Sequence, residues 1–94
     1  MFKEIIFTKN TLEFKNDTTL ATLTFTTNER SYHITSIVVS PILRGQGIAG
    51  KLMDEFCNFA EKNNKKILPI CPYAISWFDK HPNKKLQFVI EKEV

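Results

Sequence analysis

The hydrophobic pattern of the chain changes its period once, next to Pro41, and this change limits the fold more than any other feature. Up to residue 39 the sequence is rich in Thr, Ile, Val and Phe and is broken by Asn-containing turns, as is typical of β-strands. In 19–27, Ala21, Leu23 and Phe25 alternate with Thr and Leu, which predicts one apolar face. After Pro41, apolar residues recur every three or four positions, which is the period of an amphipathic helix.

These patterns predict a complete order of elements. A residue before proline avoids the helical region, so His81-Pro82 is expected to end the second helix. The continuous apolar run 37–39 predicts a strand that is covered on both sides. We expect an antiparallel meander over 3–8, 11–15, 19–27 and 31–39, a helix over 46–62, a strand over 66–71, a helix over 73–80 and a strand over 86–93.

Length predicts one domain over residues 1–94, and the patterns above give it an α/β (α+β) class with a mostly antiparallel sheet, one long helix and a short C-terminal helix. The chain has 94 residues, of which 43% are hydrophobic, so one small core is expected. No apolar run reaches the roughly 18–20 residues of a membrane span, and no signal peptide is recognisable. Cys57 lies close to the apolar face of the long helix and is interpreted as an ordinary core residue. Two cysteines form no disulfide framework, which favours a cytoplasmic location.

The net charge of +3 arises entirely in the second half of the chain. Residues 1–43 carry four basic and four acidic groups, whereas residues 44–94 carry nine basic and six acidic groups. This field suits a polyanionic small ligand. No basic stripe is interleaved with exposed aromatic residues, so a nucleic-acid partner is not expected.

The stretch "RGQGIAGK" at 44–51 fits three nucleotide-binding motifs. Gly45, Gly47 and Gly50 give G-x-G-x-x-G, and Gly45 to Lys51 give G-x-x-x-x-G-K. Arg44, Gly47 and Ala49 give R-x-x-G-x-A, a signature of acetyl-CoA binding. All three motifs bring backbone N–H groups close to a phosphate at a helix N-terminus.

The surrounding sequence separates the three motifs. A nucleotide phosphate loop needs Ser or Thr after its lysine, but position 52 is Leu. A dinucleotide site expects an acidic residue about 20 positions later, and the next predicted strand ends "LPICPY". The acetyl-CoA motif has its expected context. The order along the chain is an apolar strand, the five-residue turn "SPILR", the glycines, a helix and another strand.

Two longer segments carry a family resemblance. "VVSPILRGQGIAGKLM" resembles the acetyl-CoA-binding segment of the GCN5-related N-acetyltransferase superfamily. "LRGQGIAGKLM" followed by "CPYAISWFDKHP" resembles the small GCN5-like, YjdJ-type acetyltransferase family, and this likeness extends over residues 19–88. The resemblance implies a GCN5-like acetyltransferase fold and transfer of an acetyl group from acetyl-CoA to an amine.

The resemblance also implies a coenzyme site. Main-chain groups at the start of the helix would surround the pyrophosphate, and those of the preceding strand would pair with the pantetheine arm as an added β-strand does. The strand residues are equally explained as buried core, and both interpretations can hold because the contacts use the main chain. The implied cofactor-binding residues are Ile37, Val38, Val39, Arg44, Gly45, Gln46, Gly47, Ile48, Ala49, Gly50 and Lys51.

Cys71 is the candidate catalytic residue. The resemblance implies that its thiolate takes the acetyl group before the amine does. The alternative is a buried, inert thiol, as most free cysteines are. Tyr73 is a candidate proton donor to the leaving thiolate, although core packing is the commoner role. His81 is a candidate base, although His-Pro more commonly marks a helix end.

Two adjacent positions depart from the small family, and the sequence does not identify the acceptor. That family carries His-Thr where this chain has Ser36-Ile37, and strand alternation predicts that His33 faces away from Ser36. The leading function is acetyl transfer from acetyl-CoA, without a metal, to an unknown amine, which is a protein lysine, a polyamine or a metabolite. The alternatives are a coenzyme A-binding module or acyl sensor, and a small interaction protein whose glycine turn is only structural.

Overall fold

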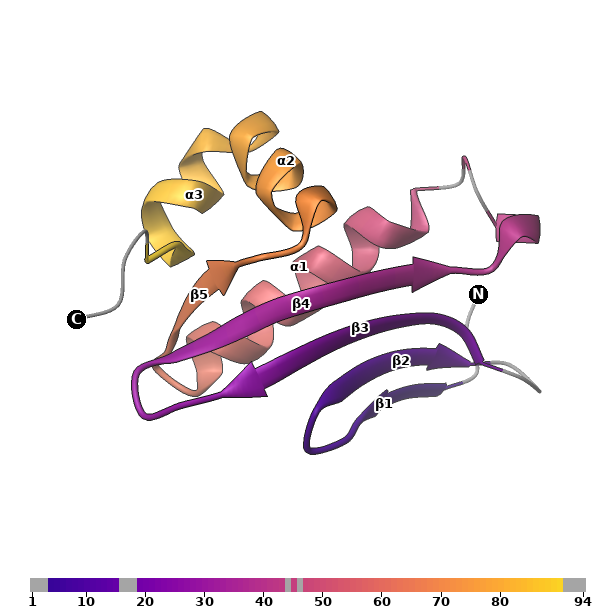
Figure 1. Cartoon of the computed structure of the whole chain (residues 1–94), viewed down its shortest axis with the longest axis horizontal. Helices are drawn as coiled ribbons and strands as arrows, with labels where there is room; N and C mark the ends of the chain where they lie inside the picture. The colour runs from indigo at the N-terminus through magenta and orange to yellow at the C-terminus, as the bar shows by residue number, and fades with distance from the viewer. Residues whose placement is uncertain (1–3, 16–18, 44, 46, 91–94) are drawn as a thin grey trace.

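The computed structural model describes residues 4–15, 19–43, 45 and 47–90, which form a five-stranded sheet with three helices beside it (Figure 1). The strands are arranged in sequence order, antiparallel from β1 to β4, and β5 runs parallel to β4. The mostly antiparallel sheet and the long helix are therefore confirmed. The elements are β1 (Glu4–Phe7), β2 (Thr11–Lys15), β3 (Thr19–Thr27), β4 (Ser31–Val39), the 3-10 turn η1 (Pro41–Leu43), α1 (Ile48–Lys62), β5 (Lys66–Pro69), α2 (Pro72–Lys80) and α3 (Pro82–Phe88).

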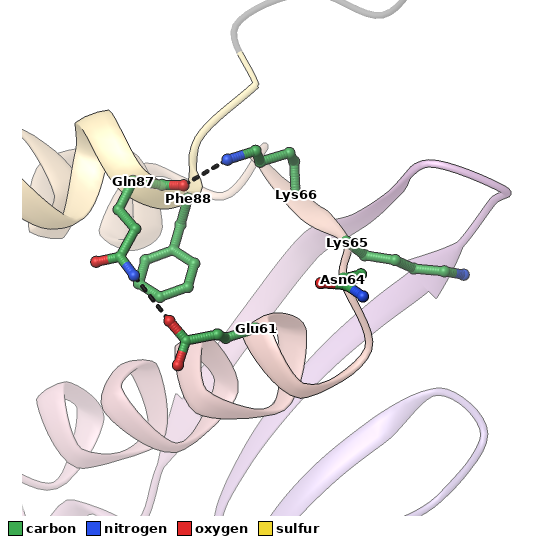
Figure 2. Close-up of a pocket in the computed structure, with 6 residues that line it drawn as sticks. All are labelled: Glu61, Asn64, Lys65, Lys66, Gln87 and Phe88. Atoms are coloured by element: carbon green, nitrogen blue, oxygen red, sulfur yellow. Dashed lines mark hydrogen bonds between the residues drawn. The ribbon is translucent and has the colours of Figure 1, made fainter.

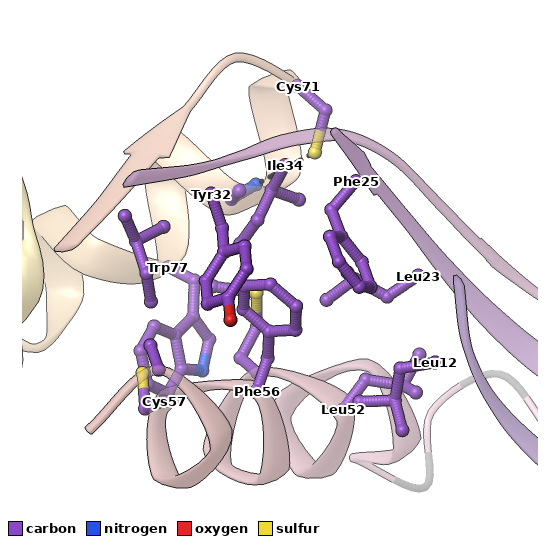
Figure 3. Packing of buried hydrophobic residues seen from close by; sticks show 14 of the residues in the cluster. Leu12, Leu23, Phe25, Tyr32, Ile34, Leu52, Phe56, Cys57, Cys71 and Trp77 are labelled. Atoms are coloured by element: carbon purple, nitrogen blue, oxygen red, sulfur yellow. Dashed lines mark hydrogen bonds between the residues drawn. The ribbon is translucent and has the colours of Figure 1, made fainter. Parts of the chain in front are cut away.

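The core lies between one face of the sheet and the helices (Figure 3). The predicted alternation in β3 is confirmed, because Ala21, Leu23 and Phe25 are all buried. They meet the apolar face of α1, where the rings of Phe25 and Phe56 lie 4.8 Å apart. The predicted face of α1 is confirmed too, and its buried residues are Ile48, Leu52, Met53, Phe56, Cys57 and Ala60.

The end of β4 is not covered on both sides, so that prediction is wrong. Val38 is 62% exposed, whereas Ile37 and Val39 are partly buried and pack against the core. The sheet carries its core on one face only, and successive residues of a strand project to opposite faces. A continuous apolar run therefore leaves its middle side chain in solvent.

The predicted strand over 86–93 is also wrong, because residues 82–88 form α3. Pro82 ends α2 as predicted, but it also occupies the first turn of α3, where its fixed φ suits a helix. The only strand-like contact in the described part of 86–93 is a parallel bridge between Val89 and Ile67; residues 91–93 lie outside the described chain. No helix among the described residues is long and apolar enough to span a membrane.

Candidate functional site

A groove opens where β4 and β5 diverge. Their parallel pairing ends at Ile34 and Pro69, and the carbonyl of Ile34 accepts hydrogen bonds from the N–H groups of Ile70, at 2.9 Å, and Cys71, at 3.1 Å. Beyond this point the chain after β5 turns into α2, while β4 continues to Val39 (Figure 1). Within the described chain, no strand pairs with the outer edge of residues 35–39. That edge can accept an extended ligand as an added strand.

The lining of this groove brings predicted residues together. Its volume is about 320 Å³, and it is lined by Ile37, Val38, Val39, Ala49 and Tyr73. The walls are therefore β4, the first turn of α1 and the first turn of α2. An apolar groove with one polar hydroxyl suits a narrow ligand that carries a single reactive group.

Tyr73 contributes the only phenol of this lining. The side chain is 42% exposed, so the expectation that it packs in the core is wrong. Partial burial raises the pKa of the Tyr73 hydroxyl above its ordinary value. At neutral pH the group is therefore protonated and can donate a proton into the groove.

The glycine turn leads directly into α1 and leaves its N-terminus open. Gly45 and Gly47 have φ of 84° and 73°, in the left-handed region that side chains disfavour. A Cβ at either position would meet no heavy atom within 4 Å, so another molecule can come close to the backbone. Arg44 and Gln46 lie outside the described residues.

The first turn of α1 carries favourable charge for an anion. Gly47 is the N-cap and provides no side-chain cap, and the first intrahelical bond runs from Lys51 N–H to the Gly47 carbonyl, at 3.1 Å. The N–H groups of Ile48, Ala49 and Gly50 therefore precede the helical ladder and point out of the helix. Because the first turn holds no acidic residue, the positive end of the helix dipole is not neutralised by a neighbouring carboxylate.

Gly50 differs from the other two glycines. It lies inside α1, where a Cβ would come to 3.6 Å from Nε1 of Trp77, an ordinary contact distance. The indole of Trp77 stacks on the ring of His81 at 4.2 Å and lies against α1. This contact helps to dock α2 beside the glycine turn.

Cys71 caps α2 through its sulfur. Its Sγ accepts a hydrogen bond from the N–H of Ala74, at 3.3 Å, and the residue is only 7% exposed. Figure 3 shows the sulfur directed toward Ile34 and Phe25 in the buried cluster. The thiol therefore lies beside the divergence of the strands, behind the lining of the groove rather than in it.

The second thiol has a different environment. Cys57 is fully buried on α1, as predicted, and burial raises its pKa to about 12. A thiol that stays protonated at neutral pH is a poor nucleophile. Cys57 is therefore a natural control for Cys71.

Neither histidine is placed beside Cys71. Nδ1 of His81 lies 2.7 Å from the Trp77 carbonyl, and His81 and Cys71 cap opposite ends of α2. His33 pairs with Thr26, whereas its neighbours Tyr32 and Ile34 are buried. The structure thus gives the two histidines no role at the sulfur. Within the described ranges, no group of three His, Cys, Asp or Glu side chains is arranged to hold a metal ion.

The predicted orientation of His33 relative to Ser36 is wrong. Ser36 pairs with Thr24, but Ile34 pairs with Phe25, so the register shifts by one residue between them. Directly paired residues lie on the same face of a sheet, and Thr24 and Thr26 share one face of β3. Their partners Ser36 and His33 therefore share a face as well, and the shift cancels the alternation.

A second hollow, of about 210 Å³, lies at the opposite end of α1 (Figure 2). Its polar groups hold elements together. Nε2 of Gln87 donates to Glu61 at 2.8 Å, and Nζ of Lys66 donates to the carbonyl of Gln87 at 2.6 Å. These bonds fasten α3 to α1 and β5, so we interpret this hollow as a structural joint.

Comparisons with known proteins agree with this arrangement. A family model described as "GCN5-related N-acetyl-transferase" matches residues 11–87. A solution structure of a protein from Staphylococcus aureus, described as a "GCN5-like putative N-acetyltransferase", is 27% identical with a TM-score of 0.77, over 96% of this chain and 90% of that one.

A more distant neighbour is the ribosomal-protein-S18-alanine N-acetyltransferase from Escherichia coli. It is 17% identical with a TM-score of 0.63, and the match covers 80% of this chain. The match covers 54% of that enzyme, and at 17% identity this likeness concerns the fold alone. Among proteins of curated function, no sequence match was found.

Proposed function

Because the chain belongs to the GCN5-related N-acetyltransferase family, we propose that it binds acetyl-CoA and transfers the acetyl group to an amine. The observation that carries this proposal is the continuity of the groove with the glycine turn. The outer edge of β4 leads past Ala49 to the open N-terminus of α1, so one ligand can contact both. Membership of the small YjdJ-type group within the family stays a prediction.

The proposed coenzyme pose uses main-chain groups at both ends. The pantetheine amides pair with the edge of Ile37–Val39, and the pyrophosphate oxygens accept hydrogen bonds from the N–H groups at the start of α1. Positive φ at Gly45 and Gly47 permits the close approach that this needs. The roles of Arg44 and Gln46 stay predictions from the motif.

The proposed reaction is direct attack by the acceptor amine. The neutral amine adds to the thioester carbonyl, the C–S bond breaks, and the sulfur of coenzyme A leaves as a thiolate. Tyr73 lines the groove, and its raised pKa keeps the proton available for this thiolate. The proton that the acceptor nitrogen loses passes to solvent, and solvent returns a proton to the Tyr73 phenolate, so the cycle closes without a net change in protons.

The acetyl-cysteine route is a second candidate. In this route Cys71 Sγ attacks the thioester, coenzyme A leaves, and the amine then attacks the acetyl-cysteine. The bond from Ala74 N–H holds the sulfur at the N-terminus of α2, close to the point where β4 and β5 diverge, which favours this route. Burial of the sulfur among apolar side chains opposes the route, because the residue is only 7% exposed and the thioester has little access to it.

The deciding experiment measures binding first and turnover second. Coenzyme A at about 100 times its Kd should raise the free energy of unfolding by roughly 2.7 kcal/mol. Incubation with acetyl-CoA and a panel of polyamines, lysine peptides and small metabolic amines, followed by mass analysis, then reports transfer. A melting temperature unchanged by millimolar coenzyme A contradicts the proposal and favours the interaction protein. Binding without turnover favours the coenzyme A-binding module or acyl sensor.

A further inference from the structure

A β-bulge interrupts the pairing of β3 with β4 at Thr35. Thr24 pairs with Ser36, and the next residue, Phe25, pairs with Ile34, so Thr35 is the extra residue in β4. The hydroxyl of Thr35 donates a hydrogen bond to the main-chain carbonyl of Thr24, at 3.2 Å. One side chain thus ties the bulged strand to its partner.

The bulge stands where the coenzyme groove begins. The last parallel pair between β4 and β5 is Ile34 with Pro69, one residue before Thr35. The residues that line the groove from β4 begin at Ile37, two residues after it. Because a bulge bends its strand and increases the local twist, it accounts for the departure of β4 from β5 at this point.

The bulge also sets which groups of β4 meet a ligand. A shift of one residue in a strand turns every later side chain to the other face. The same shift exchanges the residues whose N–H and C=O groups point toward β3 with those pointing toward the open edge. Loss of the bulge would therefore present the wrong main-chain groups to the pantetheine arm, without removing any residue of the groove.

We propose that Thr35 is a positioning residue, whose hydroxyl holds the β4 bulge in the register that the coenzyme requires. This inference rests on the proposed binding of acetyl-CoA. Thr35 is not one of the residues that line the groove, and its hydroxyl bonds to the carbonyl of Thr24, so it would act through the backbone of residues 36–39.

The test compares three variants of the full chain with coenzyme A as the probe. Thr35→Val keeps the branched shape and removes the hydroxyl, and Thr35→Ser restores the hydroxyl without the methyl group. Thr26→Val makes the same change at an exposed position of β3 that pairs with His33, on the other side of the bulge. Calorimetry well below the melting temperature gives Kd, so a loss of stability alone does not change the result.

Thr35→Val is expected to weaken coenzyme A binding about fivefold, the effect of one net hydrogen bond. The Kd of Thr35→Ser and of Thr26→Val for coenzyme A should stay within about twofold of the wild-type value. Cross-strand NMR contacts between Thr24 and Ser36 should weaken only in Thr35→Val.

Three results overturn the inference. Wild-type affinity in Thr35→Val shows that the hydroxyl is dispensable, and an equal loss in Thr35→Ser or Thr26→Val shows that its effect is not specific. Unchanged NMR contacts in Thr35→Val show that the bulge does not depend on the hydroxyl. If the wild-type protein binds no coenzyme A, the proposed function fails and with it the use assigned to the bulge, while the NMR contacts still report what holds the register.

Discussion

Gly47 and Gly50 stand three residues apart in one motif, but only Gly47 needs to be glycine for its backbone conformation. Its φ is 73°, whereas Gly50 lies within α1. Gly47→Val should abolish detectable coenzyme A binding, because a β-branched side chain resists positive φ and occupies the approach to the helix start. Isothermal calorimetry checks this, and circular dichroism should confirm a folded protein, since a Cβ at Gly47 meets open space. Unchanged affinity would show that the pyrophosphate does not bind at this turn.

A substitution at Gly50 should change the stability of the fold and leave coenzyme binding intact. Gly50→Ala should raise the free energy of unfolding by up to about 1 kcal/mol, because alanine has the higher helix propensity. The added methyl meets Trp77 at 3.6 Å, which requires no movement. Denaturant unfolding measures the gain, and coenzyme affinity should be retained. A loss of affinity without a loss of stability would show that the phosphate needs closer access at Gly50.

The two cysteines separate the direct route from the acetyl-cysteine route. If Cys71 carries the acetyl group, incubation with acetyl-CoA adds one acetyl mass at Cys71, and Cys71→Ala abolishes both adduct and transfer. If transfer is direct, Cys71→Ala keeps wild-type turnover per folded molecule. Peptide mass mapping after rapid acid quenching distinguishes these results. An adduct on Cys57 would contradict its raised pKa and burial.

Cys57 also predicts a pH dependence of stability. Its pKa rises from 9.0 to about 12 on burial, so between these values the folded protein holds a proton that the unfolded chain has lost. The contribution of Cys57 to the free energy of unfolding is therefore constant below pH 9. It becomes steadily less favourable as the pH rises from 9 toward 12. Urea unfolding of the wild type and Cys57→Ala across this range should show a shallower alkaline decline in the variant. Parallel declines would show that the buried thiol is not responsible.

At the scale of elements, sequence patterns were reliable where one period dominated. The alternation of Ala21, Leu23 and Phe25 and the helical spacing of α1 each had a single interpretation, and both are confirmed. The segment after Pro82 contains apolar residues that fit either period. It forms a helix, because the proline in its first turn fixes a helical φ. The bulge at Thr35 has no composition signal, because it arises from pairing with a distant strand.

The character of α3 can be tested with two neighbouring side chains. In a strand, Leu86 and Phe88 would lie on the same face. In a helix, residues two positions apart project from different sides. Leu86 is 86% exposed and Phe88 is 4% exposed. Phe88→Ala should lower the free energy of unfolding by about 3–5 kcal/mol, and Leu86→Ala by less than about 0.5 kcal/mol, as measured by urea unfolding. Similar large losses in both variants would support the strand.

At the scale of the whole molecule, the candidate site is asymmetric. The groove and the glycine turn lie at the junction of β4, α1 and α2, while β1 and β2 form the opposite side of the sheet (Figure 1). Amides that exchange only through global unfolding should all gain the same protection when coenzyme A binds, since the ligand stabilises the folded state alone. The edge strand β1, whose side chains are mostly exposed, opens locally and should gain almost nothing.

This asymmetry gives a prediction for amide hydrogen exchange with and without coenzyme A. Protection should rise most in residues 36–39 and 48–51, because these amides either contact the ligand or begin the helix that holds it. Gly47→Val serves as the control, and added coenzyme should change none of its exchange rates. A uniform rise in the globally exchanging amides, without an additional rise at residues 36–39 and 48–51, would contradict local contact of the ligand with these two segments. A maximum at β1 and β2 would contradict the groove itself, because Glu13 and its neighbours lie two strands away from Val38 in register.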